Sequence, residues 1–183
     1  MIRILDIFLS FFGLFILSPI LILFFVIGFF DTGSPIFRQE RIGRFEIPFI
    51  LVKFRTMHKD AESVASHLSD PSKITKFGLF LRKTKLDELP QLWNVLKGDM
   101  SIVGPRPGLF NQKELRNERK IHGVFDVRPG ITGLAQTSSI DMSTPKLLAE
   151  TDAKMIKKLG VLSYLKFIVM TIIGKGQGDS AKR

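Results

Sequence analysis

The distribution of apolar and polar residues divides the chain into three parts. Ile7 to Phe30 is an uncharged and almost wholly apolar run. As a straight helix it would be on the order of 36 Å long, which is enough for the hydrocarbon core of a bilayer. Residues 32–174 mix apolar and polar positions as a folded domain does, and residues 175–183 are polar and basic. The pattern predicts a membrane helix over 1–31, a membrane-associated domain over 32–174 and a basic tail over 175–183.

Ser18 and Pro19 interrupt the apolar run near its middle. Pro19 has no N–H to donate to the carbonyl of Phe15, and its ring crowds that turn, so a helix should kink here. The hydroxyl of Ser18 can satisfy a freed carbonyl, which makes such a break tolerable in lipid. A cleaved signal peptide does not fit, because the run is too long and only Arg3 precedes it as a basic residue. Two topologies stay equally open, a kinked single span and a re-entrant helix that leaves on the side where it entered.

Periodicity and turn residues predict the elements of the remaining chain. We expect strands over Ile47–Phe54 and Met100–Val103, and helices over Met57–Leu68, within Ser72–Leu86 and over Val161–Ile173. The helix within 72–86 has a basic face and an apolar face, as an interfacial helix has, although a core-facing helix with a solvated side is the commoner case. The helix over 161–173 is short for a bilayer span and suits a core or interfacial position. The fold class expected is α+β, dominated by helices and with a few short strands.

The composition narrows the choice of partners. Lys and Arg number 27 against 17 Asp and Glu, a formal net charge of +10, which suits nucleic acid, an anionic bilayer surface or phosphorylated substrates. The aromatic residues are 17 Phe with one Trp and one Tyr, a set that disfavours base stacking and therefore nucleic acid. The absence of cysteine excludes a disulfide framework and a thiolate metal site. Basic residues after the apolar run, Arg38, Arg41 and Arg44, favour a cytoplasmic domain.

Adjacent carboxylates mark the candidate chemistry. Asp87 and Glu88 stand at the start of a helix predicted over Glu88 to Lys97, with Pro90 in its first turn and Gly98 after its end. Asp87 is then expected to be the N-cap of this helix, which is the commoner role of such an Asp. The cap and a chemical role are compatible, because helix amides hold a carboxylate ionised and oriented.

Arg106 is the cation that we expect opposite this pair. It stands between Pro105 and Pro107, so its backbone has little freedom, and a fixed guanidinium is suited to clamp a phosphate. A free Asp titrates near ~3.9, so Asp87 is anionic at neutral pH without a general base. Glu88 is therefore better suited to steer a metal ion or to place a phosphate than to deprotonate Asp87. An acidic pair that faces a fixed cation indicates metal-assisted phosphate chemistry.

Five ordered blocks of sequence carry a resemblance to a known family. They are Ser18-Pro19, SPIFRQERIG (Ser34–Gly43), KFRTM (Lys53–Met57), LRKTKLDELPQLWNVLKGDMSIVGPRP (Leu81–Pro107) and VRPGITGLAQ (Val127–Gln136). With these blocks the chain resembles the small monotopic phosphoglycosyl transferases of the bacterial sugar transferase group. The resemblance implies an enzyme on the cytoplasmic face of the bacterial inner membrane. Such enzymes transfer a sugar 1-phosphate from a UDP-sugar to undecaprenyl (polyprenyl) phosphate, release UMP and start the assembly of a surface glycan, such as O-antigen, capsule or a glycoprotein glycan.

The resemblance also implies roles for single residues. Asp87 is the implied nucleophile and Mg²⁺ ligand of a ping-pong reaction through a covalent aspartyl phosphosugar, and Glu88 is its partner. The implied phosphate-binding residues are Lys53, Arg82, Arg106 and, as a further functional acid, Asp152. The Ser18-Pro19 break implies the re-entrant topology. The sequence leaves the oligomeric state open, with a homodimer as one possible assembly.

The chain departs from the pattern of the family in one region. Thr137 to Asp141 stands where many members have a Gly-Arg pair, and Met155 lies where tyrosines are common, so we assign no sugar contacts in 137–155. The alternative function is a non-catalytic, basic membrane-surface module that binds anionic lipid. Asp87 and Glu88 argue against it, since such a module gains nothing from carboxylates in a basic pocket.

Overall fold

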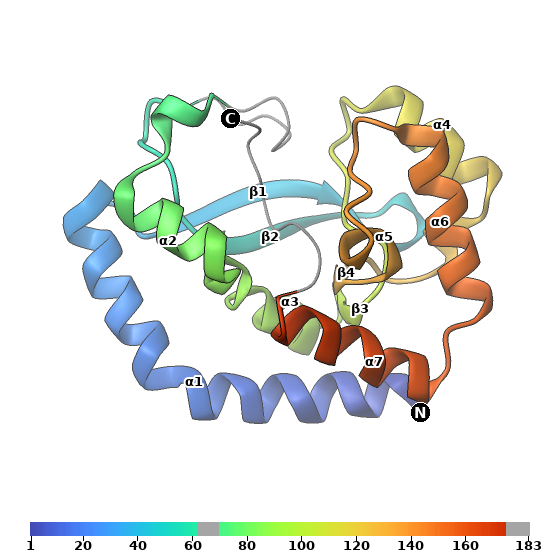
Figure 1. Ribbon diagram of the computed structural model, residues 1–183, viewed down its shortest axis with the longest axis horizontal. Coiled ribbons are helices and arrows are strands. Elements are labelled where there is room, and N and C mark those ends of the chain that lie inside the picture. The colour runs from blue at the N-terminus through green and yellow to red at the C-terminus, as the bar shows by residue number, and fades with distance from the viewer. Residues whose placement is uncertain (62–69, 175–183) are drawn as a thin grey trace.

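A computed structural model describes residues 1–61 and 70–174 of the chain. The described part is dominated by helices, with short strands and one long apolar helix at the N-terminus (Figure 1). The α-helices are α1 (Ile2–Thr32), α2 (Lys76–Thr84), α3 (Gln91–Lys97), α4 (Lys113–Ile121), α5 (Leu134–Thr137), α6 (Pro145–Lys157) and α7 (Val161–Ile172). The strands are β1 (Ile36–Ile42), β2 (Pro48–Phe54), β3 (Ser101–Val103) and β4 (Gly130–Thr132), and short 3-10 turns are η1 (Arg44–Glu46), η3 (Pro71–Lys73), η4 (Leu86–Glu88) and η5 (Val124–Asp126). The expected α+β class dominated by helices is confirmed.

The strands form two small sheets. β1 and β2 are antiparallel, with Ile36 opposite Phe54, and β3 and β4 are parallel, with Val103 opposite Thr132. The predictions for 47–54 and 100–103 correspond to β2 and β3. β1 was not predicted, because its inward positions are polar. The side chain of Arg41, for example, is buried and donates to the carbonyl oxygen of Pro107 at 3.0 Å.

The main hydrophobic core lies between β2, α3, β3 and α7. Its buried members are Phe49, Leu51, Val95, Met100, Ile102, Val103, Met155, Tyr164 and Phe167. The first turns of α1 pack against this core through Ile2, Leu5 and Leu9. A second, smaller cluster joins the far half of α1 to β2 and α2 through Phe24, Phe54 and Leu81. Both halves of the apolar helix are therefore attached to the domain.

The long helix α1 bends near its middle (Figure 1). Pro19 lies inside it, and the hydroxyl of Ser18 donates to the carbonyl oxygen of Phe15 at 2.8 Å. The expected kink and the expected hydroxyl bond are thus both present. Among the described residues α1 is the one helix that is long and apolar enough to cross a membrane, and only 11% of its most apolar window is buried.

Two predicted elements differ in the structure. Residues 57–61 are not helical, and Met57 forms an isolated bridge with Ile74, so the first part of the helix expected over 57–68 is wrong. The rest of that helix, from residue 62, and the tail 175–183 lie outside the described residues. Asp87 is not a helix N-cap, because it belongs to η4 and the N-cap of α3 is Pro90. The physical reason is Lys85, whose left-handed backbone (φ 58°) ends α2 and starts the 3-10 turn.

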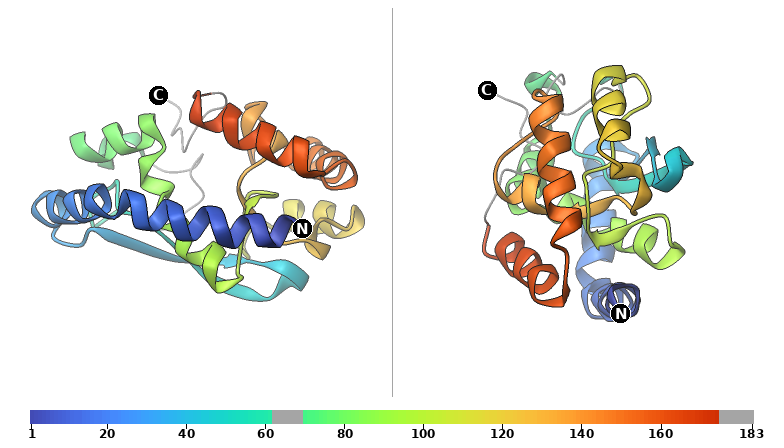
Figure 2. Two further views of the ribbon diagram at one scale, coloured as in Figure 1. Left: turned by 90° about the horizontal axis from the view of Figure 1, so that it is seen from below. Right: turned by 90° about the vertical axis from the view of Figure 1, so that its right-hand side faces the viewer.

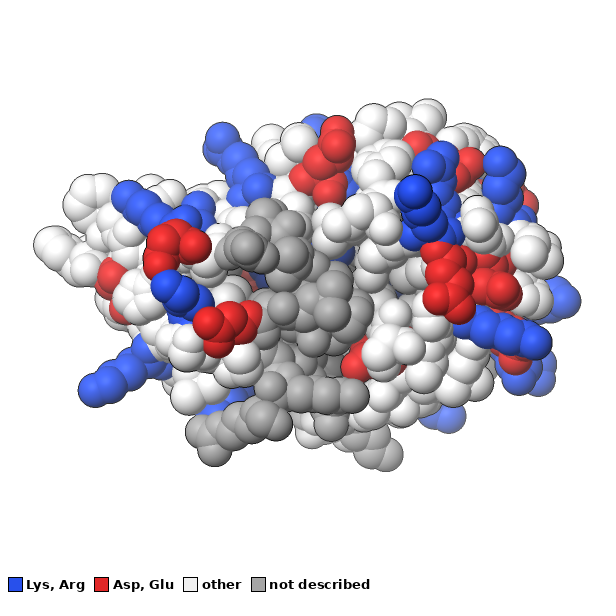
Figure 3. Space-filling view, turned by 90° about the horizontal axis from the view of Figure 1, so that it is seen from above, with Lys and Arg blue, Asp and Glu red and all other residues white. Residues whose placement is uncertain are grey.

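The two faces of the molecule differ in polarity. α1 lies along one side of the domain, with α7 next to its N-terminal half (Figures 1 and 2). On the opposite face, Lys, Arg, Asp and Glu side chains are spread over the surface and gather over the part that holds α4 and α6 (Figure 3). An apolar side therefore faces away from a charged side.

Candidate active site

The acidic pair lies in the short turn η4, between α2 and α3. Asp87 is 1% exposed and Glu88 is 8% exposed. α2 ends at its C-cap Lys85, and a single 3-10 turn then directs both carboxylates into the domain before Pro90 opens α3. Burial of two adjacent carboxylates is costly unless cations lie nearby, so their surroundings decide what the site can do.

Arg106 pairs with one of the two carboxylates. Its Nη2 atom donates to Oε1 of Glu88 at 2.8 Å, so the predicted cation and the predicted acid do meet. The loop that carries Arg106 is held between β3 and β4, because the N–H of Gly130 donates to the carbonyl oxygen of Pro105 at 2.8 Å. A Cβ on Gly104 would lie 2.6 Å from the carbonyl oxygen of Arg128, so this close approach requires glycine. The guanidinium is thus held by the fold.

Two further predicted cations belong to the elements around η4. Arg82 lies on the last turn of α2, is 8% exposed, and donates from Nε to Oγ1 of Thr56 at 2.8 Å. Lys53 is equally buried on β2, with its Nζ atom 5.8 Å from the centre of the Phe37 ring. Because α2 and β2 both pack against η4, the elements that carry these cations surround the acidic pair. Lys53 and Arg82 thus place two positive charges on the elements around the two carboxylates.

Lys85 belongs to the same neighbourhood and was not predicted as a site residue. Its side chain is partly exposed and interacts electrostatically with the Glu88 carboxylate and the Arg106 guanidinium. Burial lowers the pKa of Lys85, the carboxylate of Glu88 opposes this change, and Arg106 adds to it. The sequence signal was its position two residues before Asp87, and its backbone is left-handed (φ 58°).

Asp152 lies behind the site on α6. It is completely buried, and its Oδ2 atom accepts from Nη2 of Arg119 at 2.7 Å. Nη1 of Arg119 donates in turn to the backbone carbonyl of Arg106 at 2.7 Å. Burial raises the pKa of Asp152, and the Arg119 guanidinium only partly opposes this effect. Direct phosphate contact by Asp152 stays a prediction. Arg119, which was not predicted from the sequence, connects Asp152 to the loop of Arg106.

The carboxylates of the site fit a magnesium ion whose remaining ligands come from the substrate. Among the described residues there is no group of three or more His, Cys, Asp and Glu side chains that could hold a metal ion. Mg²⁺ in phosphate-handling sites is commonly held by one or two carboxylates together with phosphate oxygens, so an all-protein cage is not required. Asp87, the metal ligand that the sequence motif implies, and Glu88, which pairs with Arg106, are the carboxylates of this site that such an ion would meet.

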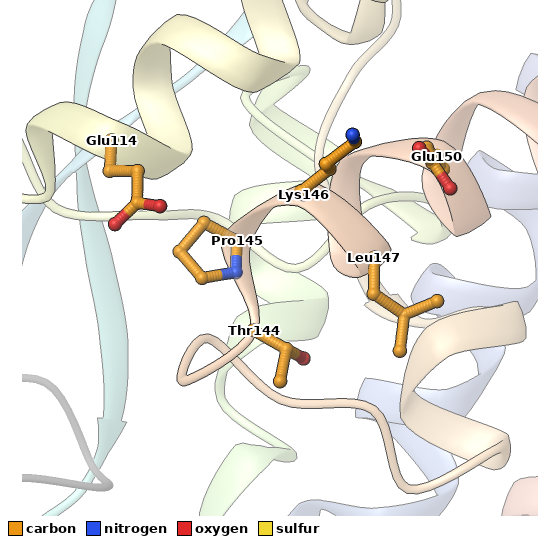
Figure 4. A pocket seen from close by; sticks show the side chains of 6 residues that line it. All are labelled: Glu114, Thr144, Pro145, Lys146, Leu147 and Glu150. Carbon is orange, nitrogen blue, oxygen red and sulfur yellow. The ribbon is translucent and has the colours of Figure 1, made fainter.

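A separate open pocket lies at the start of α6. It is lined by Glu114, Thr144, Pro145, Lys146, Leu147 and Glu150 (Figure 4). None of the predicted site residues lines it, and its carboxylates are not accompanied by the arginines that distinguish the acidic pair. The predicted site residues therefore lie around η4 and not in this pocket.

Comparisons with known proteins agree with the motif blocks. The family model described as bacterial sugar transferase matches residues 1–176. A galactosyl transferase (CpsE) of Streptococcus agalactiae is 38% identical over 83% of this chain and 37% of its own length. Transferases named UDP-glucose:undecaprenyl-phosphate glucose-1-phosphate transferase are similar too. The one from Caulobacter vibrioides is 35% identical over 78% of this chain and 57% of its own length. The one from Klebsiella pneumoniae is 37% identical over 93% of this chain and 39% of its own length. The chain thus spans between about a third and three fifths of the length of these relatives.

Proposed function

Because the chain belongs to the bacterial sugar transferase family, we propose that it transfers a sugar 1-phosphate from a UDP-sugar to undecaprenyl phosphate and releases UMP. The observation that carries this proposal is the buried Asp87–Glu88 pair, with Glu88 held at 2.8 Å by the loop-fixed Arg106. Carboxylates that are buried among cations suit a reaction between an anionic nucleophile and an anionic diphosphate. The names of the relatives support the same reaction class.

The reaction proceeds in two displacements at one phosphorus atom. A carboxylate oxygen of Asp87 attacks the sugar-side phosphorus, and the bond to the UMP oxygen breaks with its electron pair leaving on UMP. An oxygen of undecaprenyl phosphate then attacks the aspartyl phosphosugar, and the carboxylate of Asp87 leaves unchanged. Since donor and acceptor react in turn, the nucleotide and the lipid never need to occupy the site together. Glu88 pairs with Arg106 at 2.8 Å and would orient this guanidinium toward the phosphate.

Cations must neutralise the phosphoryl oxygens during both displacements. The Arg106 guanidinium is fixed by its loop, and Arg82 is fixed by its bond to Thr56, so both bind phosphate without reorganising. Lys53 supplies a third charge from β2. Mg²⁺, held by Asp87 and the diphosphate, would screen the charge of the transferred group. The protein residues therefore orient the phosphate and hold Asp87 in line with it.

The contacts of α1 support a re-entrant, monotopic attachment to the cytoplasmic face of the inner membrane. Near the N-terminus, Asp6 is buried and accepts from the hydroxyl of Tyr164 at 2.8 Å. In the far half of α1, Phe24 packs edge-on against Phe54 of β2 at 6.0 Å. A helix that crossed the bilayer would carry one of these ends to the side opposite the domain, and one set of contacts would be lost.

The covalent step is tested with an Asp87→Asn variant. Asn is nearly isosteric with Asp but is not a nucleophile, so UMP release from a panel of UDP-sugars should be abolished in detergent. Mass spectrometry of the wild-type protein mixed with donor alone should find a sugar phosphate bonded to Asp87. Wild-type levels of UMP release by the variant would contradict the mechanism.

The metal is tested separately. Removal of divalent cations with EDTA should stop UMP release, and added Mg²⁺ should restore it, because the diphosphate would otherwise repel Asp87. Full activity in EDTA, with the same adduct formed, would show that the protein cations are sufficient.

A further inference from the structure

We propose that Arg119 is a positioning residue of the reaction, which acts by fixing the backbone of Arg106, and that Asp152 is the counter-ion that holds Arg119 in place. The proposal deepens the proposed function and rests on it for the catalytic role of the Arg106 guanidinium. It gives Asp152 a role that requires no contact with substrate. It is carried by an unbroken series of contacts from α6 through α4 to the turn of the acidic pair.

The series of contacts begins at a buried carboxylate. Oδ2 of Asp152 on α6 accepts from Nη2 of Arg119 on α4 at 2.7 Å, and Nη1 of the same guanidinium donates to the backbone carbonyl of Arg106 at 2.7 Å. α4 and α6 pack against each other, so this ion pair joins two neighbouring helices (Figure 1). Nη2 of Arg106 then donates to Oε1 of Glu88 at 2.8 Å, next to the proposed nucleophile Asp87. A shift of Arg119 is therefore passed to the site through the backbone that carries its guanidinium.

The geometry of the Arg119–Asp152 pair favours this role over a purely stabilising one. An arginine that only neutralises a buried carboxylate frequently forms two parallel hydrogen bonds to its two oxygens. Within the part of the chain that the structure describes, Nε of Arg119 and Oδ1 of Asp152 are instead both buried without a hydrogen-bond partner. The pair thus forgoes a second bond between its members, and Nη1 of Arg119 bonds to the loop of Arg106.

The loop of Arg106 is held at every residue from 104 to 108. Five consecutive carbonyl oxygens accept hydrogen bonds from groups outside the loop. In chain order they are those of Gly104 from Gln136, Pro105 from Gly130, Arg106 from Arg119, Pro107 from Arg41 and Gly108 from Ile42, at 3.3, 2.8, 2.7, 3.0 and 3.0 Å. The bond from Arg119 is the shortest of the five, its donor is charged, and it is the one at Arg106 itself. Its loss therefore loosens the loop at the residue that carries the guanidinium.

The test removes the bond to the loop without leaving a buried charge unpaired. In the double variant Arg119→Met with Asp152→Val, both members of the ion pair become apolar side chains of similar total volume, a change that is often neutral for stability. Leu148→Ala is the control, because it removes a side chain of α6 that is 2% exposed and takes no part in the series of contacts. UMP release from radiolabelled donor is followed in single-turnover reactions of the full-length protein in detergent, so that slow variants stay measurable.

We expect the double variant to release UMP about 10- to 100-fold more slowly than the wild type, because displacement of a catalytic group by about 1 Å costs on the order of a hundredfold. In an Arg106→Met background the same double change should slow the reaction less than about twofold, since Arg119 acts through Arg106. Leu148→Ala should react at the wild-type rate. A purely structural pair would slow the reaction by the same factor in both backgrounds. That result, or an unchanged rate in the double variant, overturns the proposal.

Amide hydrogen exchange tests the attachment of the loop without any substrate. The N–H groups of Gly130 and Ile42 donate to the carbonyls of Pro105 and Gly108, on either side of Arg106. Their exchange therefore reports loosening of the loop. Both N–H groups should exchange about tenfold faster in the double variant, as the loss of one charge-assisted hydrogen bond allows.

The exchange result also separates this proposal from the proposed function. In Leu148→Ala the two N–H groups should exchange as they do in the wild type, because the bond from Arg119 to the loop is intact. Unchanged exchange at both positions in the double variant overturns the proposal. If the wild type releases no UMP from any UDP-sugar, the proposed function fails, and the exchange then decides whether Arg119 holds the loop.

Discussion

Arg119 is the buried residue on which the geometry of the candidate site most depends. Its side chain is 3% exposed, and its guanidinium joins the Asp152 carboxylate to the carbonyl of Arg106, each at 2.7 Å. Arg119→Met keeps the apolar stem but leaves Asp152 buried without its cation. We expect the free energy of unfolding to fall by about 3–5 kcal/mol, the usual cost of breaking a buried ion pair. Urea unfolding in detergent measures it, with Glu150→Gln on α6 as the control.

The pH dependence of the same variant has a defined sign. Burial raises the pKa of Asp152 above its unfolded value, so its contribution to stability is greatest at low pH and is lost as pH rises through the folded pKa. Arg119 opposes this increase, so Arg119→Met should raise the pKa further. Above the unfolded pKa of Asp, near ~3.9, the variant should therefore go on losing stability to a higher pH than the wild type does. A parallel pH profile would mean that the guanidinium does not control the ionisation of Asp152.

The site residues that could be predicted from the sequence are those that lie within a short continuous motif. Asp87, Glu88 and Arg106 stand in one continuous motif with prolines beside the arginine, so their proximity follows from a short stretch of chain. Arg119 had no such signal, because a charged residue on a polar helix gives no indication that it will be buried. Lys85, which interacts electrostatically with Glu88 and Arg106, was not predicted, and nothing in a lysine indicates the left-handed conformation that it adopts.

Among the elements, the N-terminal half of α1 is attached to the domain by one acidic side chain. Oδ1 of Asp6 accepts from Ser101 Oγ, from the N–H of Ile102 and from Tyr164 Oη, at 2.9, 2.9 and 2.8 Å. Asp6→Ala would leave these buried donors without an acceptor and should lower the free energy of unfolding by at least about 3 kcal/mol. Tyr164→Phe, which removes one donor together with its bond, should cost only about 1 kcal/mol. Equal costs for the two variants would show that Asp6 is not the shared acceptor that the geometry indicates.

The position of α2 depends on a glycine. A Cβ on Gly78 would lie 2.0 Å from the carbonyl oxygen of Thr56, and that backbone cannot move aside as a flexible side chain would. Gly78→Ala should therefore push α2 away from β2, disturb the Arg82–Thr56 bond and cost about 2–3 kcal/mol of stability. Gly160→Ala is the control, since nothing lies within 4 Å of its Cβ, and it should cost less than about 1 kcal/mol. A stable Gly78→Ala protein with unchanged UMP release would contradict this packing.

Helices and strands whose buried face is apolar could be predicted from the sequence, and a strand whose buried face is polar could not. β2 and α7 were found because burial of apolar side chains determines them. β1 buries Gln39 and Arg41, which are hydrogen-bonded to each other, so its pattern looked like that of a loop. The N-cap assigned to Asp87 failed because the preference for Asp at caps is statistical, whereas the turn at Lys85 sets the start of α3 at Pro90.

At the scale of the whole molecule, exposed apolar residues are concentrated on two neighbouring helices. Phe15 and Ile16 near the bend of α1 are 72% and 69% exposed, and Leu162 and Ile172 on α7 are 85% and 79% exposed. Since Tyr164 bonds to Asp6, α7 lies beside the N-terminal half of α1 (Figure 2). The exposed apolar side chains of the two helices are therefore close together. Water is a poor solvent for so large a surface, and a bilayer that accepts both helices from one side would cover it.

Such one-sided insertion has a consequence for labelling. The chain contains no cysteine, so Ile4→Cys, at a position 71% exposed near the N-terminus, introduces a unique thiol, and Lys146→Cys does so on α6. In intact spheroplasts a membrane-impermeant maleimide should label neither, because the proposed topology puts both thiols on the cytoplasmic side, and permeabilisation should expose both. Replacing Asp6, Ser18 and Pro19 together by leucine removes the polar attachment and the break, so a straight apolar helix is then free to cross. In that background Ile4→Cys should become labelled in intact spheroplasts while Lys146→Cys stays protected. If Ile4→Cys were labelled in the otherwise unchanged protein, α1 would span the bilayer, and the contacts of Asp6 with β3 and α7 could not exist in the membrane.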